Sequence, residues 1–152
     1  MLHKMMGVKI MKRTNGAYAA ELINEIARSY KLSVRIEAEN LGVKNAYRAL
    51  LSTLYVKDGG TQLSLAEKTG MKAPTISITL RKMEKEGLVR RVVDENDLRK
   101  THVYLTDKGK QTTEELNVGI EKVNKLLIDS LSDEETAIFI KALENAKNAL
   151  KD

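Results

Sequence analysis

A chain of 152 residues is long enough for one compact domain with helical extensions. Its formal net charge of +5 suits a polyanionic partner, whereas an aromatic content of only 4% argues against a stacking platform for single-stranded nucleic acid. The absence of cysteine excludes disulfides, thiol catalysis and thiolate metal sites, and the only two histidines, His3 and His102, are too far apart in sequence to suggest a metal cluster.

The N-terminal segment predicts neither a secretory leader nor a membrane anchor. Lysine and glycine interrupt every apolar run in residues 1–13, and no run in the chain approaches the roughly 20 apolar residues of a membrane span. We therefore expect a soluble, cytoplasmic protein, with no membrane partner, whose translation starts at Met1 or Met11.

The charge is unevenly distributed. Residues 1–48 carry nine Lys or Arg against four Asp or Glu, whereas residues 112–152 carry five against nine. A basic N-terminal part and an acidic C-terminal part indicate a surface on which basic and acidic regions are separate. Ordinary solvation of a small protein accounts for the same distribution equally well, so charge alone does not decide between these interpretations.

Helical periodicity governs the first part of the chain. Apolar residues recur at helical spacing over residues 17–38, and a second helix is predicted over residues 44–55, before the turn at Asp58-Gly59-Gly60. Thr61 can cap a short helix that ends at Gly70, and Pro74 marks the start of the next helix, which continues to about residue 86.

After Gly87 the pattern changes to the alternation of strands. LVRRVV and THVYL read as a hairpin with the long loop DENDLRK, and Thr106 caps a following helix. The apolar stripe of that helix consists of Leu116, Ile120, Val123 and Leu127. A capping box at Ser132–Glu135 opens a last helix, whose stripe consists of Ile138, Leu143, Ala146 and Leu150.

The predicted fold class is mainly α with a small β-hairpin wing. A short helix, a turn, a second helix and then a hairpin describe a winged helix-turn-helix, in which the second helix enters the major groove of DNA. At about 100° per residue, that helix buries Ile76, Leu80 and Met83. Its opposite face carries Thr75, Ile78, Arg81, Lys82 and Lys85, with Ser77 at the edge.

Ile78 is an apolar residue on the predicted outer face, and two interpretations of it stay open. It can contact a thymine methyl group in the major groove. It can equally be one of the isolated surface apolar residues that carry no function.

Several motifs between residues 61 and 109 occur together in one known family. They are Leu65-Ala66-Glu67, Thr75-Ile76-Ser77, the run from Met83-Glu84 to Val89, Asp97-Leu98-Arg99, and Leu105-Thr106-Asp107-Lys108-Gly109. In this combination the chain resembles the MarR (multiple antibiotic resistance regulator) family of winged-helix transcription regulators. The motifs span about a third of the chain, and the flanking helices match in number and length only.

The resemblance implies a homodimer that grips a pseudo-palindromic site on double-stranded DNA. It implies dimerisation helices at residues 14–40 and 107–152 around a DNA-binding lobe at residues 43–106, within a single chain of 1–152. Members usually repress a nearby gene, and many release DNA when a small ligand, commonly an aromatic acid, binds between these regions. The expected DNA-binding residues are Thr61, Lys72, Pro74, Thr75, Ser77, Ile78, Arg81, Lys82, Arg91, Asp97, Arg99 and Lys100.

In the wing, we expect Asp97 to hold the guanidinium of Arg99 by a charge-assisted hydrogen bond, so that Arg99 and Lys100 meet DNA already oriented. We expect Asp94 and Glu95 to lie at the outer edge of the loop, with no role beyond solubility.

The chain departs from the family in one place, because many members carry Arg where this chain has Ile78, and so a different base preference is expected. A ligand pocket could use Tyr30, Tyr47 and Arg28, or the other candidates Tyr18, Tyr55, Arg35 and Arg48, but core packing is the commoner role for each of these residues.

The sequence shows no nucleophile–base pair, metal cluster or phosphate-binding glycine-rich loop, and we expect no enzyme activity, cofactor or metal. The alternative to a DNA-binding regulator is a winged-helix module that binds a partner protein through the acidic last helix.

Overall fold

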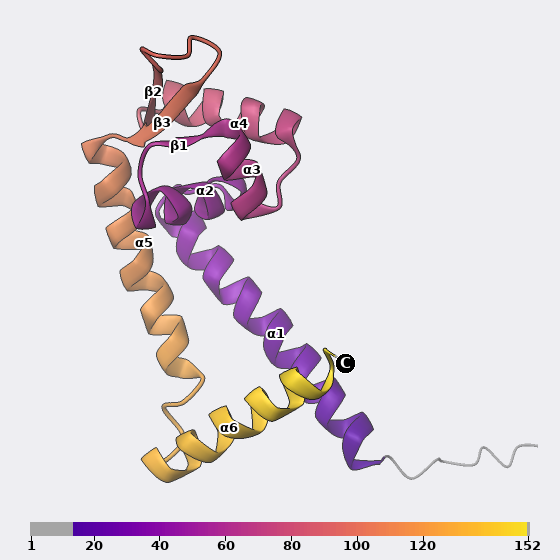
Figure 1. Cartoon of the computed structure of the whole chain (residues 1–152). Coiled ribbons are helices and arrows are strands. Elements are labelled where there is room, and N and C mark those ends of the chain that lie inside the picture. The colour runs from indigo at the N-terminus through magenta and orange to yellow at the C-terminus, as the bar shows by residue number, and fades with distance from the viewer. Residues whose placement is uncertain (1–13, 152) are drawn as a thin grey trace, which may run out of the picture. The chain divides into compact units, whose positions relative to one another are not determined.

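The computed structural model describes residues 14–151 (Figure 1). The predictions about the translation start and the absence of a leader fall on residues 1–13 and lie outside this range. Contacts divide the chain into a unit that ends at Leu32 and a unit that begins at Ser33. The two units are described separately below. Among the described residues, no helix is both long enough and apolar enough to cross a membrane.

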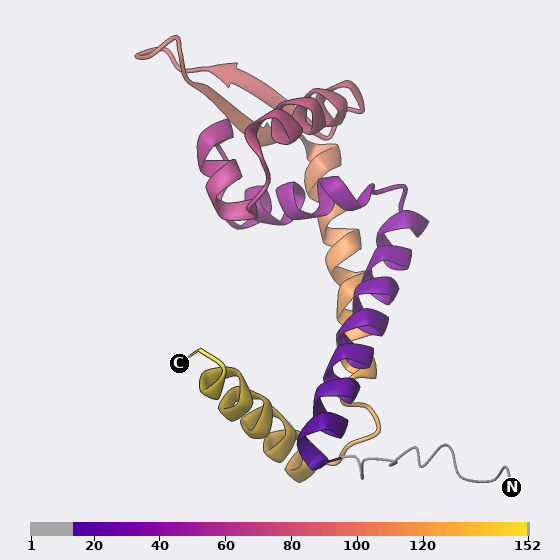
Figure 2. The same cartoon turned by 90° about the vertical axis from the view of Figure 1, so that its right-hand side faces the viewer.

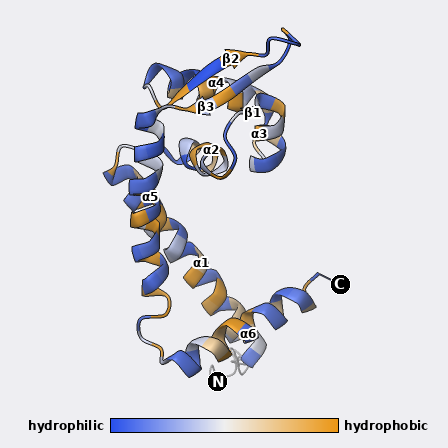
Figure 3. Ribbon diagram, turned by 60° about the vertical axis from the view of Figure 1, so that its left-hand side comes forward, coloured by the Kyte–Doolittle hydropathy of each residue, from blue (hydrophilic) through white to orange (hydrophobic). Residues whose placement is uncertain are grey.

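The first unit contains the beginning of helix α1 (Asn15–Asn40), where a helix was predicted. Its apolar residues are largely exposed: Leu22, Ile23 and Ile26 keep between 39% and 46% of their surface accessible. The last turns of α1 belong to the second unit, where Val34 and Ala38 are buried. One helix therefore has a buried end and an exposed apolar stripe. Figure 3 marks the hydrophobic residues along α1 in orange.

The second unit is built around three helices that meet in one apolar core. They are α2 (Asn45–Val56), α3 (Gln62–Thr69) and α4 (Ala73–Lys85). Leu50 and Leu54 of α2, Leu65 of α3 and Leu80 of α4 are almost completely buried there. As predicted, Thr61 caps α3, its side chain accepting a hydrogen bond from the Ser64 amide.

A three-stranded antiparallel sheet completes the lobe. Strands β2 (Val89–Val93) and β3 (Thr101–Leu105) form the predicted hairpin, and β1 (Gly60–Thr61) pairs with the other edge of β3. Sequence analysis did not predict β1, because two residues are too few to display an alternating pattern. Figure 2 shows the hairpin beside α4, with its loop extending beyond the strands.

Two helices follow the hairpin, and both begin at the predicted caps. Thr106 caps α5 (Asp107–Leu126), and Ser132 with Glu135 forms the predicted capping box of α6 (Asp133–Ala149). Helix α5 packs against α2 and buries Leu116 and Val123. Leu127, predicted in the same stripe, lies just beyond the helix and is exposed. Helix α6, every residue of which the structure describes, has no buried residue.

Candidate nucleic-acid interface

Residues that favour helix ends stand at both ends of α4. Lys72 stands at its N-cap in an extended conformation, Pro74 occupies the first turn, and Gly87 follows the helix with φ +75°. Proline suits the first turn because its missing amide has no partner there, and glycine suits a left-handed stop. The helix therefore presents a defined face to solvent.

The two faces of α4 are those predicted from helical periodicity. Ile76, Leu80 and Met83 are completely buried. The outer face carries Thr75, Ile78, Arg81, Lys82 and Lys85, all exposed, with Ser77 half-buried at its edge. Thr79 is also buried, and its hydroxyl donates to the Thr75 carbonyl at 2.7 Å, which satisfies it inside the core.

Ile78 keeps 54% of its surface exposed, so it belongs to the outer face and not to the core. Hydroxyls near the helix start and cations further along can bond phosphates and base edges, and an isoleucine between them can meet a thymine methyl group. Whether these side chains contact DNA stays a prediction.

Arg91 of β2 is held by Glu84 of α4. Its Nε lies 2.8 Å from Oε2 of Glu84, its terminal nitrogen bonds the same oxygen, and its amide donates to Oε1 at 3.1 Å. The hydrogen bonds from Arg91 lower the pKa of the Glu84 carboxyl. The guanidinium of Arg91 thus joins strand β2 to helix α4, and its predicted contact with DNA stays a prediction. The sequence carries no signal for this pair, because it depends on how β2 packs against α4.

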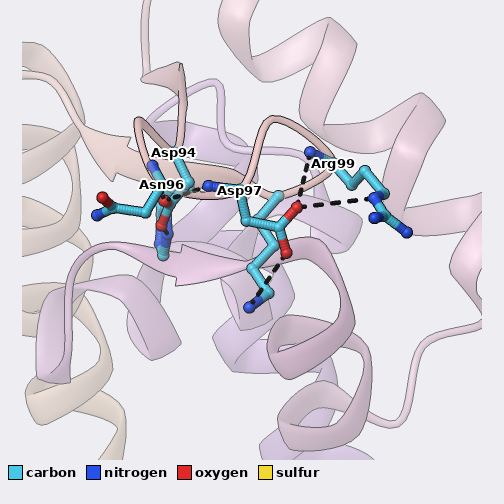
Figure 4. A network of polar contacts seen from close by, with 6 residues as sticks. Asp94, Asn96, Asp97 and Arg99 are labelled. Atoms are coloured by element: carbon cyan, nitrogen blue, oxygen red, sulfur yellow. Dashed lines mark hydrogen bonds and ion pairs between the residues drawn. The ribbon is translucent and has the colours of Figure 1, made fainter.

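Asp94 organises the loop between β2 and β3, and the expectation that it has no structural role is wrong. Its Oδ1 accepts the amides of Asn96 at 2.8 Å and Asp97 at 3.0 Å (Figure 4). Its Oδ2 lies 2.9 Å from Nε2 of His102. An aspartate that binds the amides two and three residues ahead is a common way to fix a turn.

Asp97 lies between the two cations of the loop, but it does not hold the Arg99 guanidinium by a hydrogen bond as predicted. Its Oδ1 accepts the Arg99 amide at 3.2 Å, whereas Nε of Arg99 is 3.9 Å away (Figure 4). Nζ of Lys100 is closer, at 3.4 Å from Oδ2. The Arg99 side chain is 97% exposed. Because water solvates the guanidinium almost completely, the ion pair with Asp97 restricts the Arg99 side chain little. Asp97 therefore fixes the backbone of the loop more than the guanidinium.

His102 and Tyr104 lie on the outer face of β3, because Val103 and Leu105, which alternate with them along the strand, are buried. The guanidinium of Arg90 stacks over the Tyr104 ring at 4.8 Å from its centroid. An added Cβ at Gly59, which has φ +75°, would lie 2.8 Å from that ring, so the turn before β1 requires glycine.

The tyrosines considered for a ligand pocket already have partners. The Tyr47 hydroxyl is 2.8 Å from Oε1 of Glu86 and 3.1 Å from Nζ of Lys44, and its ring is buried. Burial and then the hydrogen bond to Glu86 raise the pKa of Tyr47, whereas the contact with Lys44 acts in the opposite direction. The Tyr55 hydroxyl donates to Glu114 at 3.2 Å. Tyr30 is half-buried and Arg28 is exposed in the first unit.

Arg48 contributes a buried Nε atom with no hydrogen-bond partner among the described residues. No group of three or more His, Asp or Glu side chains within residues 14–151 could hold a metal ion. The role of Tyr30, Tyr47 and Arg28 in binding a ligand stays a prediction.

Comparison with known proteins places the site in context. A model of the MarR family matches residues 48–101, which run from within α2 to the first residue of β3. The uncharacterized HTH-type transcriptional regulator YwaE of Bacillus subtilis is 30% identical over 123 residues, which are 79% of this chain and 72% of that protein.

Solved structures show the same similarity. A mutant of MepR from Staphylococcus aureus superposes with a TM-score of 0.81 at 27% identity, covering 86% of this chain and 97% of that one. A second MepR mutant, solved bound to an oligodeoxyribonucleotide, superposes with a TM-score of 0.68 at 28% identity, covering 87% and 97%.

Proposed function

This chain belongs to the MarR family of transcriptional regulators, and we propose that it is a homodimeric repressor that reads a pseudo-palindromic DNA site and releases it when a small ligand binds. In this proposal the outer face of α4 enters the major groove and the loop of the β2–β3 hairpin reaches the adjacent minor groove. The best candidate for the ligand is an aromatic acid, which is the class that the family commonly senses.

The outer face of α4 is the observation that best supports the proposal. Two hydroxyl residues at the helix start, Thr75 and Ser77, precede Arg81 and Lys82 on a helix whose opposite face is buried. Neither cation forms an ion pair among residues 14–151. Cations without a carboxylate partner are available to neutralise phosphates, and the MepR complex with an oligodeoxyribonucleotide supports the same use of this fold.

Exposed apolar residues on the terminal helices support dimerisation. In α1, Leu22, Ile23 and Ile26 are exposed, and in α6 the same holds for Ile138 and Ile140, which keep 62% and 50% of their surface accessible. Contiguous apolar residues of this kind are expected to be covered in a stable protein. In a twofold dimer, two recognition helices would lie about one helical turn, roughly 10 bp, apart on the duplex.

Selection of bound double-stranded DNA from a random pool tests the proposal. We expect enrichment of a two-part site, with an affinity that falls steeply as salt rises, because each phosphate contacted contributes about −0.9 to the slope of log K against log salt. Failure to enrich any sequence, together with binding that is insensitive to salt, would favour the alternative of a module that binds a partner protein. Aromatic acids are then screened for release of the selected DNA.

A further inference from the structure

His102 lies between two hydrogen-bond acceptors from different parts of the lobe. Its Nδ1 is 2.8 Å from the carbonyl oxygen of Gly59, and its Nε2 is 2.9 Å from Oδ2 of Asp94. A carbonyl and a carboxylate can only accept, so each ring nitrogen must donate to satisfy both contacts. Neutral imidazole has one donor, and only the imidazolium has two.

Through Asp94, this contact reaches the tip of the wing. The other oxygen of Asp94 accepts the amides of Asn96 and Asp97, and the Asp94 amide donates to the Lys100 carbonyl at 2.9 Å. Asp97 in turn accepts the Arg99 amide. A continuous series of hydrogen bonds therefore runs from the turn before β1, through His102, to the residues that carry the exposed cations. Figure 4 shows its part from Asp94 to Arg99.

The groups around His102 favour its charged form. The Gly59 carbonyl and then the Asp94 carboxylate raise the pKa of His102, whereas partial burial and Lys100 act in the opposite direction. Its cross-strand partners, Thr61 on β1 and Val92 on β2, carry no titratable group. On β3 itself the Tyr104 ring lies 6.4 Å away, centroid to centroid. The His102 and Asp94 side chains are 27% and 25% exposed, so protons reach them without unfolding.

We propose that His102 is a positioning residue for DNA binding, and that its imidazolium ties the wing loop to the Gly59 turn and thereby fixes Arg99 and Lys100 in the arrangement that meets DNA. This inference rests on the proposed function, because it assigns a role to the wing in DNA binding. It adds that DNA affinity depends on pH, which the fold alone does not require.

The sign of the dependence follows from the direction of the pKa shift. When folding raises the pKa of a group, the structure that its charged form holds is complete below the ordinary pKa, which is 6.5 for histidine. That structure is lost as pH rises through the pKa of the folded state. The wing should therefore be most ordered, and DNA affinity highest, on the acid side. When the proton is lost, the neutral ring must give up one of its two contacts.

The test combines the proton-binding curve of His102 with the pH dependence of DNA binding between about pH 5.5 and 9, a window in which His is the main side chain to titrate. NMR follows the two imidazoles and the exchange of the Asn96 and Asp97 amides in the full chain. Binding of the selected DNA is measured for wild type, His102→Gln and His102→Lys, with His3→Gln as the matched control that removes the other histidine.

We expect the affinity of wild type and of His3→Gln to fall roughly three- to tenfold across this window, the effect of one or two hydrogen bonds at a partly exposed site. His102→Gln should bind weakly at every pH and exchange the Asn96 and Asp97 amides faster. His102→Lys separates position from charge: it keeps a cation but cannot bridge both acceptors, so it should also bind weakly throughout.

Three results would overturn the inference. The first is a His102 pKa at or below that of an unstructured histidine. The second is a pH dependence of DNA affinity in His102→Gln that matches wild type. The third is a His102→Lys variant that binds DNA at all pH values as tightly as wild type does in acid. If wild type bound no DNA at any pH, the proposed function would fail instead, and the exchange of the two amides would still report whether His102 orders the wing.

Discussion

The substitution Gly109→Ala tests how closely helix α5 approaches the end of the wing. Gly109 is buried in the first turn of α5, and an ideal Cβ there would lie 2.0 Å from the carbonyl oxygen of Leu88 and 3.2 Å from Cδ2 of Leu105. Real Cβ atoms essentially never approach another heavy atom within 3.0 Å. Backbone must therefore move by about 1 Å, since the obstacle is a carbonyl group and not the end of a flexible side chain.

The free-energy change can be worked from these contacts. The Leu88 carbonyl accepts the Thr106 amide at 3.1 Å, and the Thr106 hydroxyl caps α5 by accepting the Gly109 amide at 3.0 Å. Overpacking costs about 1–3 kcal/mol, and a weakened hydrogen bond adds about 1 kcal/mol. The higher helix propensity of alanine offsets roughly 0.5–1 kcal/mol of this loss in stability. The expected net loss of unfolding free energy is about 2 kcal/mol.

Urea denaturation, followed by circular dichroism at one fixed protein concentration, measures the change, because the stability of the proposed dimer would depend on concentration. With a slope of about 2 kcal/mol per molar urea, the midpoint should fall by roughly 1 M. Gly16→Ala in α1 is the matched control: nothing lies within 4 Å of its added Cβ, so its midpoint should stay the same or rise slightly. A Gly109→Ala midpoint equal to that of wild type would refute the reasoning.

Four further predictions concern DNA binding, the pair of Glu84 with Arg91, and dimerisation. Arg99→Ala should lower affinity for the selected DNA at least about tenfold and leave the sedimenting mass unchanged, and unchanged binding would remove the wing from the interface. Ile78→Ala should alter base preference at one position in each half-site with little effect on non-specific binding, whereas a general loss of stability would place Ile78 in the core. Glu84→Gln should cost under about 1 kcal/mol of stability near neutral pH, and the difference from wild type should vanish as pH falls through the lowered pKa of Glu84; a difference that persists in acid would exclude the Arg91 pair as its cause. Ile26→Asp should shift the sedimenting mass toward the 17.0 kDa of one chain, and an unchanged dimer would exclude this part of α1 from the dimer interface.

Features that depend on local sequence were predicted well. The orientation of α4 follows from the 3.6-residue period, which puts Ile76, Leu80 and Met83 on one side and Ile78 on the other. The caps at Thr61, Thr106 and Ser132 are also local, because each hydroxyl bonds an amide three residues ahead. Such features need no knowledge of how distant segments meet.

The parts that sequence analysis missed depend on contacts between distant segments. Strand β1 exists only because Gly60 meets Val103, and Arg91 is held only because β2 lies against α4. The role of Asp94 was missed for a related reason: its turn contacts are local, but its second oxygen is used by His102 on another strand. Residue type and spacing carry no signal for such pairs, so Asp94 looked like a surface charge.

The structure also explains how a basic DNA-binding lobe accommodates carboxylates beside its cations. Glu84 bonds Arg91, and Asp94 bonds two amides and His102, so each carboxylate has partners that offset its charge. Arg81 and Lys82 have no ion pair among the described residues, and Arg99 is almost fully exposed. The cations therefore form two groups, one that holds the lobe together and one that is available to phosphates. The net charge of +5 does not distinguish them, and the salt dependence of DNA binding should follow only the second group.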